Sequence, residues 1–276
     1  MIRATVICEN SVFSNLGALA EHGWSVHVET ESGEYLFDTG YGKTLKNNMS
    51  YFKKDWAKLS AILLSHHHID HTGGLMEAVE AVPRKPVTVY AHEEIFHESY
   101  LVRAALKPIG IPFSRASLEE KGARFVLNRG FTQIAPDLYL SGEIERTTDF
   151  ERGDTDIVVK TAGGYSQDPV PDDQSLIAKT PQGLFVILGC SHAGIVNILR
   201  HALKMTGESR IHTVIGGTHL WAVSEEQKAK SIAALAKMGI ARIGVSHCTG
   251  FDVCTRLAQT FGNGFFSCNV GSVVEL

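Results

Sequence analysis

A dense run of histidines follows a short apolar segment in the first third of the chain. On a loop at the end of a strand, His66 and His68 are two positions apart and can point the same way. Asp70 and His71 then turn toward a neighbouring position, and His67 faces away. This spacing suits two adjacent divalent metal ions, because imidazoles with a carboxylate are a ligand set that Zn²⁺ prefers. The whole run reads Ser65-His66-His67-His68-Ile69-Asp70-His71-Thr72-Gly73-Gly74.

The plain alternative for this run is a histidine-rich surface loop that collects metal without using it. That alternative needs three features to coincide by chance: the H-x-H-x-D-H order, the strand-like segment 61–64 before it and the Gly73-Gly74 exit after it. We therefore expect a metal centre with two ions. Zn²⁺ is the favoured metal, with Mn²⁺ or Fe²⁺ as alternatives.

Three more histidines stand where later apolar strands are expected to end. Any one of them alone is more often a structural residue than a ligand. Because all three follow apolar strands and lie close to glycines, we expect two or three of them to be functional, with His192 as the best additional ligand. They are His192 after 184–188, His219 after 214–217 and His247 after 243–246.

Recurring strand-like stretches indicate how these side chains are positioned. Early stretches are joined by turns such as 31–34, whereas later ones alternate with helical patterns, which describes a sheet-rich α/β sandwich. Ser224 and Gln227 form a capping box for one helix, and Gly239 ends it. The expected strands are 4–8, 24–29, 35–37, 61–64, 87–90, 183–188, 213–215 and 240–245, and the expected helices are 75–82, 195–205, 224–238 and 254–261.

No linker, repeat or low-complexity tract divides the chain, so we expect one domain over residues 1–276. The stretch 93–174 is the least regular part and is rich in proline. We expect it to be an irregular insertion of helices and loops that covers the site and selects the substrate. Its prolines are Pro108, Pro112, Pro136, Pro169 and Pro171.

Composition excludes several other classes of protein. The 276 residues are 44% hydrophobic and 20% charged, which is the balance of a globular protein with a core. The formal net charge is −4 and no basic run exceeds Lys53-Lys54, so dedicated nucleic-acid binding is not expected. Without a bilayer-length apolar run or a secretory pattern at the start, we expect a cytoplasmic protein that does not bind membranes. The five cysteines form no C-x-x-C pair and are expected to be free thiols.

The H-x-H-x-D-H run, preceded by Phe37-Asp38-Thr39-Gly40, resembles the hallmark of the metallo-β-lactamase superfamily. The resemblance implies an αββα sandwich with a mono- or dinuclear metal site at one edge of the paired sheets, and mostly hydrolytic chemistry. It also implies that Asp38 orients ligands or supports their loop, the alternative being a turn carboxylate before Gly40. His247 fits the last metal-ligand histidine of the superfamily.

Later motifs extend the resemblance over nearly the whole chain. The sequence is similar to a subfamily described as 7,8-dihydropterin-6-yl-methyl-4-(β-D-ribofuranosyl)aminobenzene 5′-phosphate synthase-like. This resemblance implies an activity in pterin-type cofactor assembly, while related members resemble phosphodiesterases or phosphatases. The motifs that carry it lie at 142–146, 149–151, 189–197, 216–220 and 246–250.

One segment departs from the common superfamily pattern. A histidine usually precedes the strand at 183–188 and a bridging aspartate follows it, whereas here Asp172-Asp173-Gln174 precedes it and Cys190-Ser191-His192 follows. Either His192 replaces the bridging aspartate, or Cys190 or Asp173 coordinates instead. We favour His192, with Cys190 as a small apolar filler.

These features predict a metal-dependent hydrolase of small phosphodiesters or related phosphate esters, acting through a metal-bound hydroxide. The alternative is a synthase that joins a dihydropterin to a phosphoribosyl-aminobenzene unit. In both cases the partner is a small anionic substrate that contains phosphate. Asp70 would ligate metal and help hold the hydroxide, and His219 would bind metal, bind phosphate or donate a proton. The helix after His192 would offer backbone N–H groups to the anion.

The other histidines and two arginines complete the expectations. His92, at the end of the strand 87–90, is a candidate to line the site. Arg146 and Arg152 are expected to be solvated surface residues; the alternative is that they bind the phosphate of the substrate. No role is expected for His22, His27, His67, His97, His201 and His212.

Overall fold

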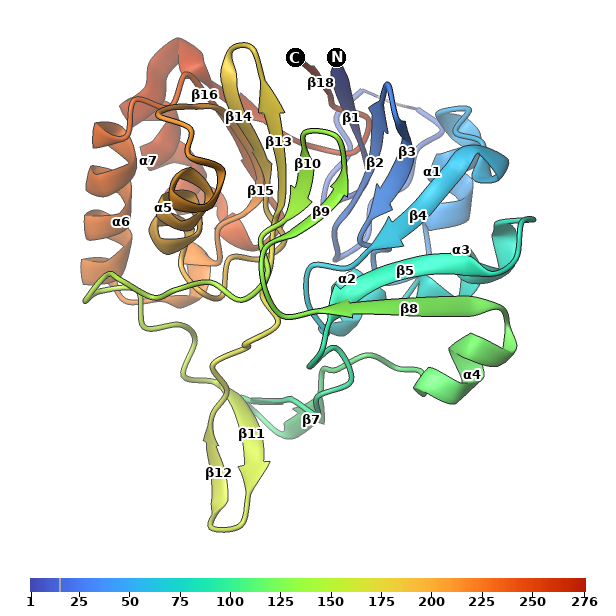
Figure 1. Cartoon of the computed structure of the whole chain (residues 1–276). Helices are drawn as coiled ribbons and strands as arrows, with labels where there is room; N and C mark the ends of the chain where they lie inside the picture. Colours follow the sequence, from blue (N-terminus) through green and yellow to red (C-terminus); the bar gives the residue numbers. More distant parts are fainter. Residues whose placement is uncertain (15) are drawn as a thin grey trace.

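Two seven-stranded sheets face each other at the centre of the molecule (Figure 1). The structure is a computed structural model that describes residues 1–14 and 16–276. The first sheet has the order β18 (Val273–Glu275), β1 (Ile2–Cys8), β2 (Ser25–Thr30), β3 (Gly33–Phe37), β4 (Leu59–Leu63), β5 (Val87–His92), β8 (Ala123–Asn128). The second has the order β17 (Phe265–Ser267), β16 (Arg242–Ser246), β15 (Ile211–Gly217), β14 (Gly183–Ile187), β13 (Leu176–Thr180), β10 (Leu138–Leu140), β9 (Thr132–Ala135).

Helices cover the outer face of each sheet. On the first sheet these are α1 (Leu45–Tyr51), α3 (Leu75–Ala81) and α4 (Arg115–Glu120). On the second they are α5 (Ile195–Thr206), α6 (Glu225–Lys237) and α7 (Phe251–Phe261). This arrangement is the αββα sandwich that the family resemblance implies, so the predicted fold is confirmed.

Alternating apolar residues hold the two sheets together. Val26 and Val28 of β2 point inward and are fully buried, as are Phe185 and Ile187 of β14 in the opposing sheet. Side chains of a strand alternate between its two faces, so the residues between these positions face the helices instead. The result is one core between the sheets and a further apolar cluster under each helical layer.

Parallel strands bring the predicted functional loops to the same edge of the sandwich. In the first sheet β3, β4, β5 and β8 are parallel neighbours, and in the second β14, β15, β16 and β17 are. Carboxyl ends of parallel strands meet at one edge of a sheet, which is where α/β proteins commonly bind ligands. The loops after β4, β14, β15 and β16 carry the histidines predicted to be functional.

Each strand and helix expected from the sequence is present, with small shifts at the ends. Ser224 caps α6 as the capping pattern predicts, since its side chain accepts a hydrogen bond from the Gln227 N–H at 3.2 Å. The helix α7 begins at Phe251, three residues earlier than expected. The strands that the sequence did not reveal are mostly short, and several are exposed at the edge of a sheet.

The stretch 93–174 is more regular than the expected insertion. The strand β8 joins the first sheet, and β9 and β10 join the second. The remaining strands form a separate small sheet with the order β12 (Gly164–Gln167), β11 (Ile157–Thr161), β6 (Tyr100–Val102), β7 (Leu106–Pro108), whose β11–β12 hairpin projects from the sandwich (Figure 1). Most residues of this small sheet are at least partly exposed, so the sequence lacks the apolar alternation that predicts strands.

Two further sequence predictions concern cysteines and membranes. All five cysteines are free thiols, as expected. Within residues 1–14 and 16–276, no helix combines the length and apolar character that crossing a bilayer requires.

Candidate metal centre

One group of potential metal ligands combines His66, His68 and His192. Their donor atoms lie within 4.8 Å of one another, and all three side chains are buried. His66 Nε2 is 3.0 Å from His68 Nδ1. His66 and His68 come from the loop between β4 and the short helix α2 (Ile69–Thr72), whereas His192 comes from the loop between β14 and α5. The two sheets thus contribute to the same group.

A second group lies beside the first and combines Asp70, His71, Cys190 and His247. Their donor atoms also lie within 4.8 Å of one another. His71 Nε2 is 3.0 Å from Cys190 Sγ, and His247 Nε2 is 3.2 Å from Asp70 Oδ2. The first three residues of this group face His247, which lies in the loop after β16, so the ends of β4, β14 and β16 meet here.

Asp38 fixes the orientation of both groups. Its Oδ2 atom lies 2.7 Å from His71 Nδ1 and accepts a hydrogen bond of 2.7 Å from Ser65 Oγ. Ser65 Oγ is in turn 2.8 Å from His66 Nδ1. Because Asp38 only accepts, the hydrogens are assigned to Nδ1 of His71 and of His66, which directs the Nε2 lone pairs of both rings into the centre.

The amino-terminal segment holds His247 in the same manner. Asn10 Oδ1 lies 2.9 Å from His247 Nδ1, and Glu9 Oε1 accepts a hydrogen bond of 2.8 Å from the His247 backbone N–H. No sequence motif marks either residue as functional. Both follow β1, and nothing in the sequence indicates that this segment contacts the loop of His247, which is more than 230 positions away.

These residues fit divalent cations. Neither ring nitrogen of the buried His192 has a hydrogen-bond partner among the described residues, which costs about 1–3 kcal/mol unless another group binds it. Burial, aided by neighbouring imidazoles, lowers the pKa values of His66, His68 and His192, so these rings are neutral donors. Imidazole, carboxylate and thiolate together are ligands for a borderline ion such as Zn²⁺.

The charge around His71 supports the same conclusion. Burial opposes protonation of this ring, but the carboxylates of Asp38 and Asp70 raise its pKa to about 9. Asp70 is only partly exposed, and burial opposes its charge, yet its pKa lies well below the usual range because His71, His22 and His247 favour its anion. A field that attracts a proton to this position attracts a metal cation as well.

Cys190 lies among the donors rather than in apolar packing. Its thiol belongs to the second group and also lies within 4.8 Å of donor atoms of His192 and His219. The departure from the superfamily pattern left open which residue takes the bridging position, and Cys190 lies close to donors of both groups. His192, the residue predicted for that position, lies within 4.8 Å of the donor atoms of His66 and His68 and also of those of Cys190 and His219.

Asp172 and Asp173 connect the two ligand loops without joining either group. Asp172 accepts hydrogen bonds from the backbone N–H and the ring of His67 at 2.7 and 2.9 Å. Asp173 accepts a hydrogen bond of 2.8 Å from the Ala193 N–H, beside His192. Adjacent carboxylates therefore hold the loop after β4 and the loop after β14, and His67 points away from the centre as expected.

The expectation that the amino terminus of α5 binds an anionic substrate is wrong. The Glu151 carboxylate already accepts hydrogen bonds from the N–H groups of Val196 and Asn197, each at 2.9 Å. A Cβ atom at Gly194 would lie 2.4 Å from the Glu151 carboxylate carbon, so the side chain fills the space. The Glu151 carboxylate therefore occupies the amino terminus of α5, where the sequence predicted an anionic group of the substrate.

His219 lies beside the centre in a strained backbone conformation. Its φ is 50°, its ring centroid is 4.2 Å from that of His192, and its Nε2 is 3.3 Å from Asp154 Oδ2. Burial opposes its charge, but the hydrogen bond with Asp154 raises the pKa of His219 to about 9. Strain of this kind is concentrated at functional sites.

The remaining candidates lie around this core. His92 Nδ1 accepts a hydrogen bond of 3.2 Å from the Glu94 N–H, and the ring belongs to neither group and does not line the cavity beside them. Arg146 donates to the backbone carbonyls of His192 and Pro169 and so supports the His192 loop. Arg152 lies in a separate pocket beside α6.

His22 is a site residue that the sequence analysis missed. Its Nε2 lies 3.3 Å from Asp70 Oδ2, and its ring centroid is 5.0 Å from that of His247. It stands in an irregular segment before β2, where no motif or strand end marks it. A cavity of about 500 Å³ connects His22 with both ligand groups.

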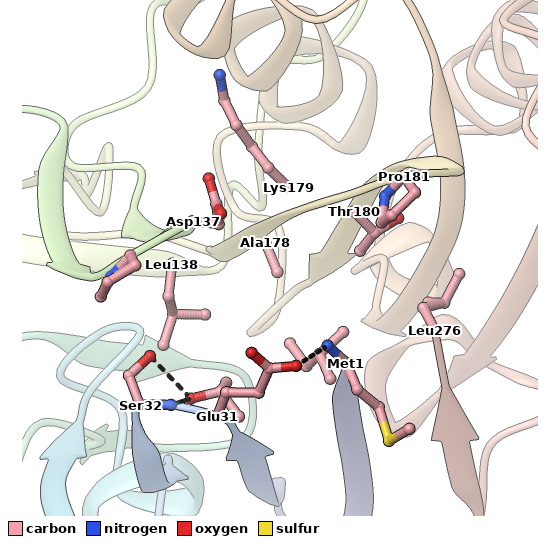
Figure 2. Close-up of a pocket in the computed structure, with 13 residues that line it drawn as sticks. Met1, Glu31, Ser32, Asp137, Leu138, Ala178, Lys179, Thr180, Pro181 and Leu276 are labelled. Carbon is pink, nitrogen blue, oxygen red and sulfur yellow. Dashed lines mark hydrogen bonds and ion pairs between the residues drawn. The ribbon is translucent and has the colours of Figure 1, made fainter.

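A second pocket lies apart from this cavity, among the chain termini and the turns of the sheets (Figure 2). Its volume is about 200 Å³, and its labelled residues include Met1, Glu31 and Leu276. Its lining includes no histidine or cysteine among the described residues. This pocket therefore lacks the donor residues that line the cavity beside the metal ligands.

Comparisons with known proteins agree with this geometry. The family model described as "Metallo-beta-lactamase superfamily" matches residues 19–190. A 7,8-dihydropterin-6-methyl-4-(beta-D-ribofuranosyl)-aminobenzene-5'-phosphate synthase of Methanocaldococcus jannaschii is 31% identical over 284 residues, which cover 99% of this chain and 96% of the relative. An uncharacterized protein of the same organism is also 31% identical, over 98% of this chain and 99% of the relative.

A solved structure is similar over the whole length of the chain. It is a metal-dependent hydrolase of the beta-lactamase superfamily with a TM-score of 0.85 and 28% sequence identity, and the match covers 100% of this chain and 99% of the other. Zn(2+)-bound PqqB from Methylobacterium extorquens has a TM-score of 0.59 at 10% identity, covering 99% and 100%, and shares the fold alone.

Proposed function

Since this chain belongs to the metallo-β-lactamase superfamily, we propose that it is a metal-dependent synthase that joins a dihydropterin to a phosphoribosyl-aminobenzene unit. The observation that carries the proposal is the end-to-end similarity to the archaeal synthase, at 31% identity over 99% of the chain. The complete set of donors at the edge of the sheets supports an enzyme rather than a binding module.

The residues of the two groups would hold the metals. His66, His68 and His192 would hold one ion, and Asp70, His71, Cys190 and His247 the other. Divalent cations held there, Zn²⁺ by preference, supply Lewis acidity to the oxygen atoms of phosphate groups and of water. Hydrogen bonds with Asp38, Ser65 and Asn10 keep the donor atoms of His71, His66 and His247 oriented before any ion or substrate binds.

Proton transfer in the proposed reaction falls to His219. When the aminobenzene nitrogen bonds to the methyl carbon of the pterin, a phosphate-ester oxygen leaves that carbon and the amine loses a proton. His219 lines the cavity, and Asp154 holds its Nε2 at 3.3 Å. Its Nδ1, which has no partner among the described residues, is placed to hold or transfer a proton in the cavity.

Hydrolysis of small phosphodiesters, the function that the sequence analysis favoured, becomes the second candidate. The similarity to the metal-dependent hydrolase, with a TM-score of 0.85 at 28% identity, is the observation that favours it. In this reaction the same ligands would hold the metals, and His219 would donate a proton to the alcohol that leaves.

Two parallel assays with metal-loaded protein test the proposal. One supplies a dihydropterin with a phosphate leaving group and a phosphoribosyl-aminobenzene, and follows the joined product by mass spectrometry. The other supplies bis(p-nitrophenyl) phosphate and follows nitrophenol release. We expect the joined product from wild type and none from Asp70→Asn. Hydrolysis of the diester without any joined product would reject the synthase and support the second candidate.

A further inference from the structure

The small sheet forms one wall of the active-site cavity. In its register, Leu101 of β6 pairs with Lys107 of β7 on one side and with Ile157 of β11 on the other. Paired residues share a face, so Leu101, Lys107 and Ile157 point to the same side of the sheet, and Arg103 follows directly after β6. Each of them lines the cavity, which members of both ligand groups also line.

Arg103 is held in a fixed position at this wall. Its guanidinium carbon lies 4.6 Å from the centre of the Trp221 ring, a cation–π contact across the cavity. Its Nε is 3.3 Å from Asp156 Oδ2, and its terminal nitrogen is 3.9 Å from Asp154 Oδ2. Because Asp154 also binds His219, only one carboxylate separates this cation from the residues at the metal centre.

Lys107 is the second cation of this wall. Among the described residues its ammonium has no hydrogen-bond or ion-pair partner, whereas Arg103 has two carboxylates nearby. It stands beside the apolar side chains of Leu101, Ile109 and Ile157 in the cavity wall. A cation placed between an apolar wall and solvent fits a ligand with an apolar body and an anionic end.

We propose that Lys107, Arg103 and Trp221 form a subsite for the phosphate and the aromatic ring of a phosphorylated aromatic substrate, such as the phosphoribosyl-aminobenzene unit. Lys107 and Arg103 bind the phosphate, and the ring packs against Trp221 and the apolar wall. The opposite end of the substrate, with its reactive group, then lies toward His219 and the ligand groups. This proposal rests on the proposed function, because it specifies which end of a phosphorylated aromatic substrate the small sheet recognises.

The first experiment measures binding of phenylphosphonate to metal-loaded protein by calorimetry, without turnover. We expect Lys107→Ala to weaken binding about tenfold, the loss of one charge-assisted interaction, and Lys107→Arg to restore most of the affinity. Lys160→Ala is the matched control, since Lys160 is an exposed lysine of β11 in the same small sheet that does not line the cavity. Wild-type affinity in Lys107→Ala would overturn the subsite and show that phosphonate binds at the metals alone.

Recognition of the ring needs a separate comparison. Trp221→Leu is expected to weaken phenylphosphonate several-fold more than methylphosphonate, because both probes lose the contact that positions Arg103 but only the first probe has a ring. Equal losses for both probes would overturn the aromatic part of the proposal. These binding results are independent of the joining assay. If the joining assay fails but Lys107→Ala still weakens phenylphosphonate binding, the synthase is rejected and the subsite is retained. If the joined product forms but Lys107→Ala binds phenylphosphonate like wild type, the subsite is rejected and the synthase is retained.

Discussion

The Oδ2 atom of Asp38 lies 2.7 Å from His71 Nδ1, although Asp38 follows a different strand from the histidine run. The same carboxylate accepts from the backbone and the hydroxyl of Ser65, each at 2.7 Å. Asp38 also has a φ of 58°, a left-handed conformation that aspartate tolerates better than most residues. One carboxylate therefore orients a ligand in each of the two metal groups.

Asp38→Asn should weaken metal binding without unfolding the protein. The amide retains one acceptor oxygen but cannot accept from Ser65 and His71 as two equivalent carboxylate oxygens do. We expect affinity for the metals to fall about 10- to 100-fold, as is typical when a hydrogen-bond partner of a ligating histidine is lost. Competition with a chelator, followed by elemental analysis, measures this change.

Asp137→Asn is the control for Asp38→Asn. Asp137 also has a φ of 58° but lies in the turn between β9 and β10, away from the centre. Asn tolerates this conformation, so metal content should equal that of wild type. Equal metal retention in the Asp38 and Asp137 variants would contradict the orienting role.

Cys190→Ser should change the spectrum of cobalt-substituted protein. Burial raises the pKa of the Cys190 thiol, so a thiolate forms there only when a cation compensates its charge. We expect a sulfur-to-cobalt charge-transfer band in wild type that is lost in Cys190→Ser. Cys254→Ser, on α7, should keep the band. A band that persists in Cys190→Ser would mean that Cys190 does not bind metal.

The sequence predicted the parts of the centre that follow one another along the chain. His66 through His71 form a continuous run after a buried strand, and strand ends with nearby glycines marked His192 and His247. Contacts between loops that are distant in the sequence could not be predicted, because no sequence pattern shows which loops meet in space. Asn10 reaches His247 across 237 positions, and Glu151 reaches Val196 from a segment expected to be irregular.

The small sheet shows the same limit for the fold. Buried strands such as β4 and β14 have apolar patterns that the sequence reveals directly. The strands β7 and β12 are exposed at every position, so pairing rather than burial defines them. Their position could be predicted only from the register with β6 and β11, which sequence periodicity does not encode.

His27 should make the stability of the protein sensitive to acid. The side chain is fully buried, and burial together with Lys54 lowers its pKa to about 4. The unfolded chain binds this proton near pH 6.5, so between pH 6.5 and 4 the unfolded state holds more protons than the folded state. Stability from this group is present above pH 6.5 and is lost as the pH falls, by about 3 kcal/mol at most.

Urea denaturation of wild type and His27→Gln at pH 7 and pH 5 measures this effect. The glutamine variant should lose less stability than wild type between these values, because it has no proton to gain. His212→Gln, a partly exposed histidine of β15, should follow wild type more closely. An identical pH dependence in wild type and His27→Gln would show that other groups determine the acid sensitivity.

Glu151→Ala should destabilise the fold through the amino terminus of α5. The substitution leaves the buried N–H groups of Val196 and Asn197 without their acceptor, which costs about 1–3 kcal/mol. Glu145→Ala removes an exposed ion pair with Lys204 and should change stability by less than about 1 kcal/mol. Chemical denaturation of both variants compares these values. Gly194 lies against Glu151 and close to His192, so Glu151→Ala is also expected to retain metal less tightly than wild type. If this variant retains metal as wild type does, Glu151 stabilises the helix α5 without positioning the loop that carries His192.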